Sequence, residues 1–398
     1  MAWVLKCLVI LTAVYISMIA TAPTSPSLHS SFRRYVKMLH TINNSPLLKE
    51  EWNKFQTLDR SSPLRRQTSL NCPNGQRSST QPTSVHKLRA GDIDVIAALG
   101  DSLTAGNGVL AWTVIGCLTE YRGRSWSIGG DNDYLSGTTT LPNIMKQFNP
   151  NLIGASTGSG NANSAGANLN VAVAGAIAQD MPTQARNLVN KLTSDSRIDL
   201  EKDWKMVTLF IGGNNLCDFC SDLIAHSAET MIANVAEALD ILRDNIPRLY
   251  VNLLEIFDIS PIAGLGDGII CGLVHGAVCS CGTGSGADKA AISELSRAYQ
   301  IAVRDLVESG RYDGREDFTV VTQSFFRETT PPAKSDGSPD LSYFAPDCFH
   351  FSEKGQNIAG RALWNNLIEP LGAKSIDWGL DQSVRCPMTT YLPTKQNS

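Results

Sequence analysis

The chain has 398 residues, of which 42% are hydrophobic and 18% are charged, so it is long enough to bury one large core or two smaller ones. The formal net charge of −4 gives no sign of nucleic-acid binding, and we expect no nucleic-acid partner. The charge is unevenly divided. Residues 28–90 carry 11 basic and three acidic side chains, whereas residues 91–398 carry 22 basic and 35 acidic ones. A basic N-terminal segment therefore precedes an acidic body.

Residues 1–22 have the pattern of a secretory signal peptide. Lys6 precedes the apolar stretch 7–16, and the small residues Ala20-Thr21-Ala22 follow as a cleavage pattern. The apolar stretch is short for a membrane span, and no second stretch of spanning length follows it. We therefore expect a secreted, extracellular protein that is soluble once the signal peptide has been removed.

Residues 23–85 are rich in Ser, Pro, Asn and Arg and show little periodicity. We interpret them as a basic N-terminal arm or pro-segment, extended except for a short helix around residues 32–39. The simpler interpretation is a solvated segment, and the alternative is an arm that docks on the acidic body or on anionic lipid surfaces. Arg65-Arg66 is a dibasic pair at which such an arm could be removed, and Asn43-Asn44-Ser45 is a glycosylation sequon.

The number of cysteines agrees with secretion. Without Cys7 in the signal peptide nine cysteines remain, and most of them should form disulfides in an oxidising compartment. The odd number leaves one thiol free or paired between molecules. A zinc site is the alternative for Cys217, Cys220, Cys279 and Cys281, but their spacing fits none of the common zinc patterns. We expect no metal and no cofactor.

From residue 92 onwards, predicted strands alternate with predicted helices. Short apolar runs rich in β-branched residues predict strands at 93–99, 206–211, 249–254 and 318–322. Apolar residues at helical spacing predict helices over 232–242, 292–306 and 358–367, the last one beginning after Ser352 as N-cap. Residues 154–166 are rich in Gly, Ser and Asn and predict a loop. This alternation indicates an α/β fold with a parallel central sheet and helices on both faces.

The first predicted strand runs directly into Gly100-Asp101-Ser102-Leu103. Glycine allows a tight turn at this point, and ligands of open α/β sheets bind at the carboxyl ends of the strands. Ser102 is therefore a candidate nucleophile. The tripeptide Gly-Asp-Ser alone is weak evidence, because average residue usage produces it in about one chain of this length in ten.

A serine nucleophile needs a base and a carboxylate that orients the base. Asp347-Cys348-Phe349-His350 offers both just before the last predicted helix, because an Asp and a His three residues apart on one turn can form a hydrogen bond. The alternative is an ordinary turn aspartate and a surface histidine, and taken alone this motif favours that alternative.

Oxyanion donors should come from the ends of other strands. The run 206–211 leads into Gly212-Gly213-Asn214-Asn215, which would place the Asn214 side chain beside Ser102 if the two strands are neighbours. A second apolar run, 170–174, ends at Gly175, whose N–H group could point the same way. Both segments can also be read as turns.

These four segments, in this order, resemble the conserved blocks of the GDSL/SGNH hydrolase superfamily. The stretches 82–89, 125–131, 344–352 and 362–370 are similar to its vertebrate phospholipase members, and the likeness covers about residues 70–390. It implies an SGNH-type three-layer α/β/α hydrolase domain over residues 86–390, followed by a polar tail at 391–398. It also implies Ser102 as nucleophile, His350 as general base, Asp347 as its partner, and an oxyanion hole made of the N–H groups of Ser102 and Gly175 and the Asn214 side chain.

The implied activity is hydrolysis of the acyl esters of glycerophospholipids, both phospholipase A and lysophospholipase, through an acyl-enzyme on Ser102. Phospholipids and lysophospholipids would be the substrates, with transient contact to a lipid surface. A carbohydrate acetyl-esterase of the same superfamily and a non-catalytic secreted lipid-binding protein are the alternatives.

Two features depart from the family pattern. Asn215 stands where the third block usually has Asp, which puts the support of that loop in doubt but not the donor at Asn214. The vertebrate enzymes carry tandem repeats and a C-terminal membrane anchor, whereas we find one unit and no anchor here. Membrane attachment is therefore not expected.

Overall fold

The computed structural model describes residues 29–55, 60, 66–261, 265–266, 268–283 and 286–397. The predicted signal peptide at 1–22 and Arg65 of the dibasic pair lie outside these residues. At the centre is a sheet with strand order β1-β2-β3-β4 in which all three pairings are parallel. Its strands are β1 (Ile93–Gly100), β2 (Trp204–Phe210), β3 (Leu249–Leu254) and β4 (Phe318–Gln323). The four predicted strands and the α/β class are confirmed.

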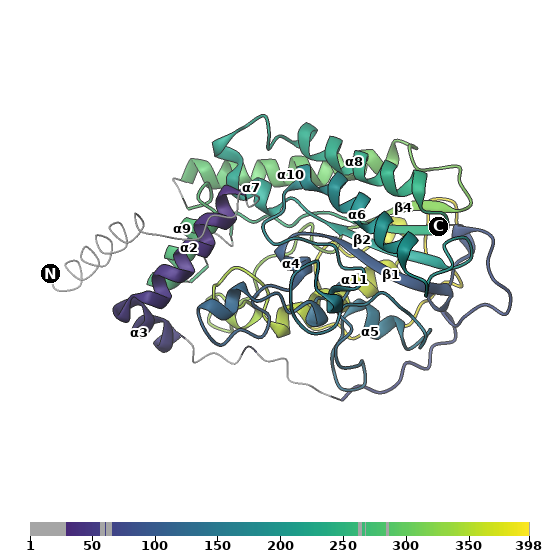
Figure 1. Ribbon diagram of the computed structural model, residues 1–398, viewed down its shortest axis with the longest axis horizontal. Helices are drawn as coiled ribbons and strands as arrows, with labels where there is room; N and C mark the ends of the chain where they lie inside the picture. Colours follow the sequence, from purple (N-terminus) through teal and green to yellow (C-terminus); the bar gives the residue numbers. More distant parts are fainter. Residues whose placement is uncertain are drawn as a thin grey trace.

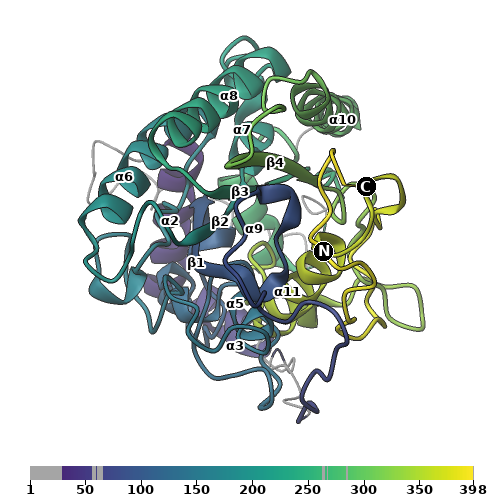
Figure 2. The same cartoon turned by 90° about the vertical axis from the view of Figure 1, so that its right-hand side faces the viewer.

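Helices cover both faces of this sheet. On one side lie α6 (Met181–Ser194), α8 (Ala228–Asn245) and α10 (Gly286–Glu308), and on the other lie α5 (Leu141–Met145) and α11 (Glu353–Leu367) (Figures 1 and 2). The helices predicted at 232–242, 292–306 and 358–367 correspond to α8, α10 and α11. Ser352 accepts a hydrogen bond from the Gly355 N–H and so caps α11 as predicted. Parallel strands need such crossover helices, which is why the strands are buried on both faces.

Irregular segments continue the sheet beyond the free edge of β1. Ile153 and Asn170 form parallel bridges to Val95 and Ala98, and the Val173 N–H donates to the Gly100 carbonyl. The buried Arg122 guanidinium donates to the carbonyls of Asn170 and Ala172 and so holds this segment in place. The chain is therefore guided past the end of β1 to Gly175.

The N-terminal segment is folded where the sequence suggested an extended arm. It contains α2 (Ser30–Asn44) and α3 (Pro46–Phe55), and α2 packs against α9 (Ile269–Val278) and α7 (Gly213–Asp218) (Figure 1). The extended, solvated interpretation is therefore wrong over these residues, whereas the short helix predicted around residues 32–39 lies within α2. This segment folds onto the body because one face of α2 carries a narrow apolar stripe, in which Tyr35, Met38, Leu39 and Ile42 are buried. The stripe is hard to recognise in the sequence because basic and polar residues lie between its members.

The cysteines pair as an oxidised framework. Disulfides join Cys72 to Cys386, Cys217 to Cys279, Cys220 to Cys281 and Cys271 to Cys348, and Cys117 is a free, buried thiol. The four cysteines considered for zinc form two of these disulfides, so that alternative is wrong. The expectation of one unpaired thiol is confirmed.

One glycine lets α11 approach the body closely. A Cβ atom at Gly360 would lie 2.4 Å from the Thr139 carbonyl oxygen and 2.9 Å from that of Trp126. We expect Gly360→Ala to lower the free energy of unfolding by about 1–3 kcal/mol because the backbones must move apart.

Gly276→Ala on α9 is the matched control for this prediction. Gly276 is also helical, but nothing lies within 4 Å of a Cβ atom there. Alanine should be neutral or stabilise by up to about 1 kcal/mol at this position. Denaturant unfolding of both variants is the measurement, and equal changes in the two would refute the packing argument.

Candidate active site

Ser102 lies at the turn between β1 and the short helix α4 (Ser102–Ala105). Gly100 takes φ +155°, and a Cβ atom on it would lie 2.6 Å from the Phe210 carbonyl oxygen, so only glycine fits. The Gln184 amide of α6 both accepts from the Gly100 N–H and donates to its carbonyl, each at 2.9 Å. The end of the strand is therefore held by two hydrogen bonds just before Ser102, the candidate nucleophile.

Asp101 caps α4 and directly precedes the candidate nucleophile Ser102. Its side chain accepts from the Leu103 N–H at 2.9 Å. Burial raises the pKa of Asp101 to about 6, and the hydrogen bond from Leu103 and the nearby His350 offset only part of that effect. No role for Asp101 was predicted from the sequence, although Asp is a common N-cap.

The structure joins Ser102, His350 and Asp347 in one chain of hydrogen bonds. His350 Nε2 lies 2.8 Å from Ser102 Oγ, and His350 Nδ1 lies 2.7 Å from Asp347 Oδ2. All three residues are at most 3% exposed. Ser102 and His350 are 248 positions apart in the sequence, so only the fold brings them together. This is the arrangement of nucleophile, base and orienting carboxylate.

Asp347 is held as a carboxylate although it is fully buried. Burial alone would raise its pKa, but His350, the Tyr35 hydroxyl and the Phe349 N–H lower the pKa to about 2. Its Oδ1 accepts from the N–H groups of Phe349 and His350, each at 3.0 Å. Because a carboxylate only accepts hydrogen bonds, His350 Nδ1 must carry the proton, which leaves Nε2 free to accept from Ser102.

Helix α9 holds the turn that carries Asp347 and His350. Cys348, between them, takes the left-handed φ of +59° and is joined to Cys271 of α9 by a disulfide. His275, one helical turn further along α9, lies with Nε2 2.9 Å from the Cys348 carbonyl oxygen. Neither α9 nor a role for His275 was predicted. The pairing of Cys271 with Cys348 was open because spacing alone does not determine connectivity.

Asn214, the first oxyanion candidate, lies beside Ser102. It lies at the start of α7 just after β2, the strand next to β1, and its Nδ2 donates to the Ala176 carbonyl at 2.9 Å. Together with Ser102 it lines a cavity of about 20 Å³ whose other walls include Phe257, Ile259 and Phe349. This cavity is large enough for about one water molecule.

Gly175 is placed by the segment that runs past the end of β1. It takes φ +79°, and a Cβ atom on it would lie 2.5 Å from Cβ of Phe32, which belongs to the N-terminal helix α2. The bond from Asn214 to the Ala176 carbonyl connects the two oxyanion candidates. The contact with Phe32 was not predicted from the sequence.

Asn215 does support its loop, which answers the doubt raised by the missing aspartate. Its Oδ1 accepts from the Ala178 N–H at 2.9 Å, and its Nδ2 donates to Gln179 Oε1 at 3.0 Å and lies 3.2 Å from His226 Nδ1. An amide can both accept and donate, so it satisfies partners of both kinds here.

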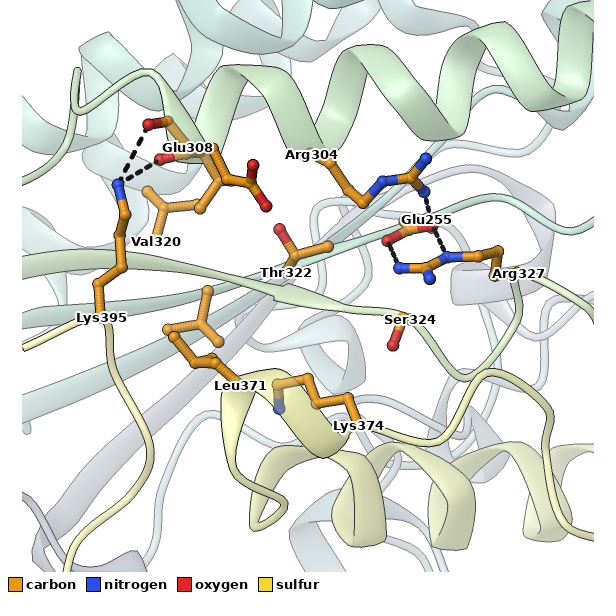
Figure 3. A pocket seen from close by; sticks show the side chains of 12 residues that line it. Glu255, Arg304, Glu308, Val320, Thr322, Ser324, Arg327, Leu371, Lys374 and Lys395 are labelled. Carbon is orange, nitrogen blue, oxygen red and sulfur yellow. Dashed lines mark hydrogen bonds and ion pairs between the residues drawn. The ribbon is translucent and has the colours of Figure 1, made fainter. Parts of the chain in front are cut away.

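A larger cavity of about 430 Å³ lies elsewhere, between β4, α10 and the C-terminal segment (Figure 3). Arg304 and Arg327 converge on the buried Glu255, and burial lowers the pKa of Lys374 to about 7. Neither Ser102 nor His350 lines this cavity. The larger cavity therefore does not coincide with the hydrogen-bonded triad, which is the candidate site. In the described ranges, no group of three or more His, Cys, Asp or Glu side chains could hold a metal ion.

The chain is similar to known proteins of one family. Residues 96–363 match the family GDSL-like Lipase/Acylhydrolase. Phospholipase B1, membrane-associated, from Homo sapiens is 45% identical over 347 residues, which cover 84% of this chain and 24% of that protein. The proteins of that name from Mus musculus and Rattus norvegicus are each 42% identical over 343 residues, covering 83% of this chain and 23% and 24% of theirs. The chain thus spans about a quarter of the length of these curated relatives.

A solved structure, phospholipase A1 from Streptomyces albidoflavus NA297, matches at 16% identity and a TM-score of 0.26, covering 66% of this chain and 94% of that one. None of the helices within the described ranges combines the length and the apolar character needed to cross a bilayer.

The family match spans well over half of the chain and contains Ser102 together with its hydrogen-bonded His350 and Asp347. The chain therefore belongs to the GDSL-like lipase/acylhydrolase family and is a carboxylic ester hydrolase.

Proposed function

We propose that this protein is a secreted serine esterase that removes acyl chains from glycerophospholipids and lysophospholipids. The single observation that carries the catalytic part is the continuous hydrogen-bonded chain from Ser102 through His350 to Asp347. The substrate class is supported by the 45% identity to human phospholipase B1. The four disulfides support an oxidising, extracellular location.

The mechanism follows from the positions of these groups. Ser102 Oγ attacks the ester carbonyl while His350 Nε2 takes its proton, and Asp347 stabilises the imidazolium that forms. The tetrahedral oxyanion accepts hydrogen bonds from the N–H groups of Ser102 and Gly175 and from the Asn214 amide. His350 then gives the proton to the departing alcohol oxygen, which leaves an acyl-enzyme. Water activated by His350 attacks this ester, releases the fatty acid and regenerates Ser102.

The experiment compares ester classes on the full-length secreted protein. We expect fatty-acid release from both phosphatidylcholine and lysophosphatidylcholine, and little acetate release from acetylated sugars. The reverse pattern would identify a carbohydrate acetyl-esterase. In parallel, a fluorophosphonate should label Ser102, since an oxygen–phosphorus bond forms as fluoride leaves, and peptide mass spectrometry locates that adduct. Lipid binding with neither turnover nor labelling would identify a non-catalytic lipid-binding protein.

The Asn214 amide provides a separate test of the oxyanion hole. One of its two N–H groups donates to the Ala176 carbonyl, which orients the amide and leaves the second N–H for the oxyanion. We expect Asn214→Ala to lower kcat by about 100- to 1,000-fold, as loss of one oxyanion donor does.

Asn365→Ala is the matched control for that variant. Asn365 is similarly buried and also donates to a carbonyl, that of Ser383, at 2.9 Å, but it lies on α11 and does not line the cavity at Ser102. We expect this variant to lose some stability and keep its kcat. A near-normal kcat in Asn214→Ala would remove that residue from the mechanism.

A further inference from the structure

The N-terminal helix α2 lies across the end of the sheet that carries the catalytic groups. Arg34 fastens it to the body, with Nη2 2.6 Å from Asp218 Oδ1 and Nε donating to the Ala277 carbonyl. At its start, His29 lies 2.7 Å from Asp180. These bonds connect α2 to α7, to α9 and to the segment before α6, all of which also hold parts of the site. Helix α2 is therefore docked at a defined position.

That position brings one α2 side chain into the catalytic hydrogen-bond chain. The Tyr35 hydroxyl donates to Asp347 Oδ2 at 2.6 Å, on the same oxygen that faces His350 Nδ1. Tyr35 is fully buried, and its ring meets the His350 imidazole edge-on, with centroids 5.5 Å apart. Tyr35 thus touches both the carboxylate and the base, although 312 positions separate it from Asp347.

The chemistry of this contact makes Tyr35 a permanent donor. Burial and the neighbouring Asp347 raise the pKa of the Tyr35 phenol well above its ordinary value, so the hydroxyl keeps its proton while the enzyme works. A hydrogen bond to a buried carboxylate is stronger than most, because solvent does not stabilise the buried negative charge. Asp347 Oδ2 is thereby held between two donors, and its direction toward His350 is determined.

We propose that Tyr35 is a positioning residue for catalysis, which holds Asp347 in the orientation that keeps His350 in its reactive tautomer. This inference rests on the proposed esterase mechanism and adds a fourth member to it, supplied by the N-terminal segment. No proton leaves Tyr35 in the cycle. It follows that the α2 portion of the basic N-terminal segment belongs to the active enzyme. Removing α2 would take away a hydrogen-bond partner of Asp347.

The test is Tyr35→Phe, which keeps the packed ring and removes only the hydroxyl. We expect kcat to fall by about 10- to 100-fold, the equivalent of one hydrogen bond to a charged group, with KM unchanged because Tyr35 does not touch substrate. The rate of Ser102 labelling by a fluorophosphonate should fall by a similar factor. The far-downfield proton NMR signal of the bond between His350 and Asp347 should shift or broaden.

Tyr250→Phe is the matched control. Tyr250 is equally buried, and its hydroxyl donates to the Pro393 carbonyl at 2.8 Å, away from the triad. The two variants should lose similar stability in thermal unfolding, but only Tyr35→Phe should slow labelling and change the NMR signal. Equal labelling rates in wild type and Tyr35→Phe would overturn the inference. So would equal slowing in both variants with an unchanged NMR signal.

Fluorophosphonate labelling also separates this inference from the proposed substrate. If the wild type releases no fatty acid but labels at Ser102, the phospholipase proposal fails, and the comparison of labelling rates still decides the role of Tyr35. If Ser102 of the wild type does not label at all, there is no activated nucleophile to position, and both proposals fail.

Discussion

Replacement of Ser102 by alanine is expected to abolish ester hydrolysis, with a loss in kcat of about 10⁶-fold. Without Oγ no acyl-enzyme can form, and the oxyanion donors alone supply only a small residual rate. The measurement is fatty-acid release from phosphatidylcholine and lysophosphatidylcholine at enzyme concentrations high enough to detect that residual rate. Loss of both activities in one variant would place both on the same nucleophile.

Ser296→Ala is the control for the serine substitution. Ser296 is also fully buried, and its hydroxyl donates to the Ile292 carbonyl within α10 at 2.8 Å. Both variants should unfold at nearly the wild-type temperature, and only Ser102→Ala should be inactive. If lysophospholipid hydrolysis survives in Ser102→Ala, a second site must carry that activity.

Substitution of Asp347 by asparagine should have the second-largest effect, a fall in kcat of about 10⁴-fold. An asparagine amide can donate to His350 Nδ1, which would move the imidazole proton to Nε2. Nε2 would then donate to Ser102 Oγ instead of accepting its proton, and the base would be lost although the geometry survives. The measurement is kcat on lysophosphatidylcholine. A loss of less than tenfold would mean that the orientation of His350 depends on other contacts.

The matched control for this substitution is Asp92→Asn. Asp92 is 2% exposed and accepts from Ser78 and the Arg89 N–H, at the opposite end of β1 from Ser102. We expect this variant to lose stability while keeping its kcat.

Asp347 should also leave a signature in the acid stability of the protein. Its pKa is about 2 in the folded protein against an ordinary 3.8, so its contribution is complete above about pH 4 and is lost as the pH falls toward 2. A shift of this size corresponds to about 2 kcal/mol. In denaturant unfolding between pH 5 and 2, Asp347→Asn should therefore lose less stability than the wild type.

Local pattern determined much of the framework. The four strands read from short β-branched runs match β1 to β4, because a strand buried on both faces is a continuous apolar run that needs no partner to be recognised. Helices α8, α10 and α11 carry their apolar residues at helical spacing, and Ser352 marks the start of α11. The order of the four blocks identified Ser102, Gly175, Asn214, Asp347 and His350 as candidates, and three of these five now form a hydrogen-bonded chain.

Contacts between residues far apart in the sequence were decided only by the tertiary structure. Only a short helix around residues 32–39 was predicted where α2 lies, and its full length and docking were not, because its apolar stripe is narrow and its burial depends on α9, which was itself not predicted. Three such contacts join segments at least 77 positions apart. They are the hydrogen bond from Tyr35 to Asp347, the disulfide between Cys271 and Cys348, and the hydrogen bonds between Gln184 and Gly100. Such long-range pairings produce no periodic pattern in the local sequence, because each of these residue types is also common in segments without such a contact. The sequence by itself thus indicated the four strands, three of the helices and the candidate reacting groups, whereas packing decided which side chains hold those groups in place.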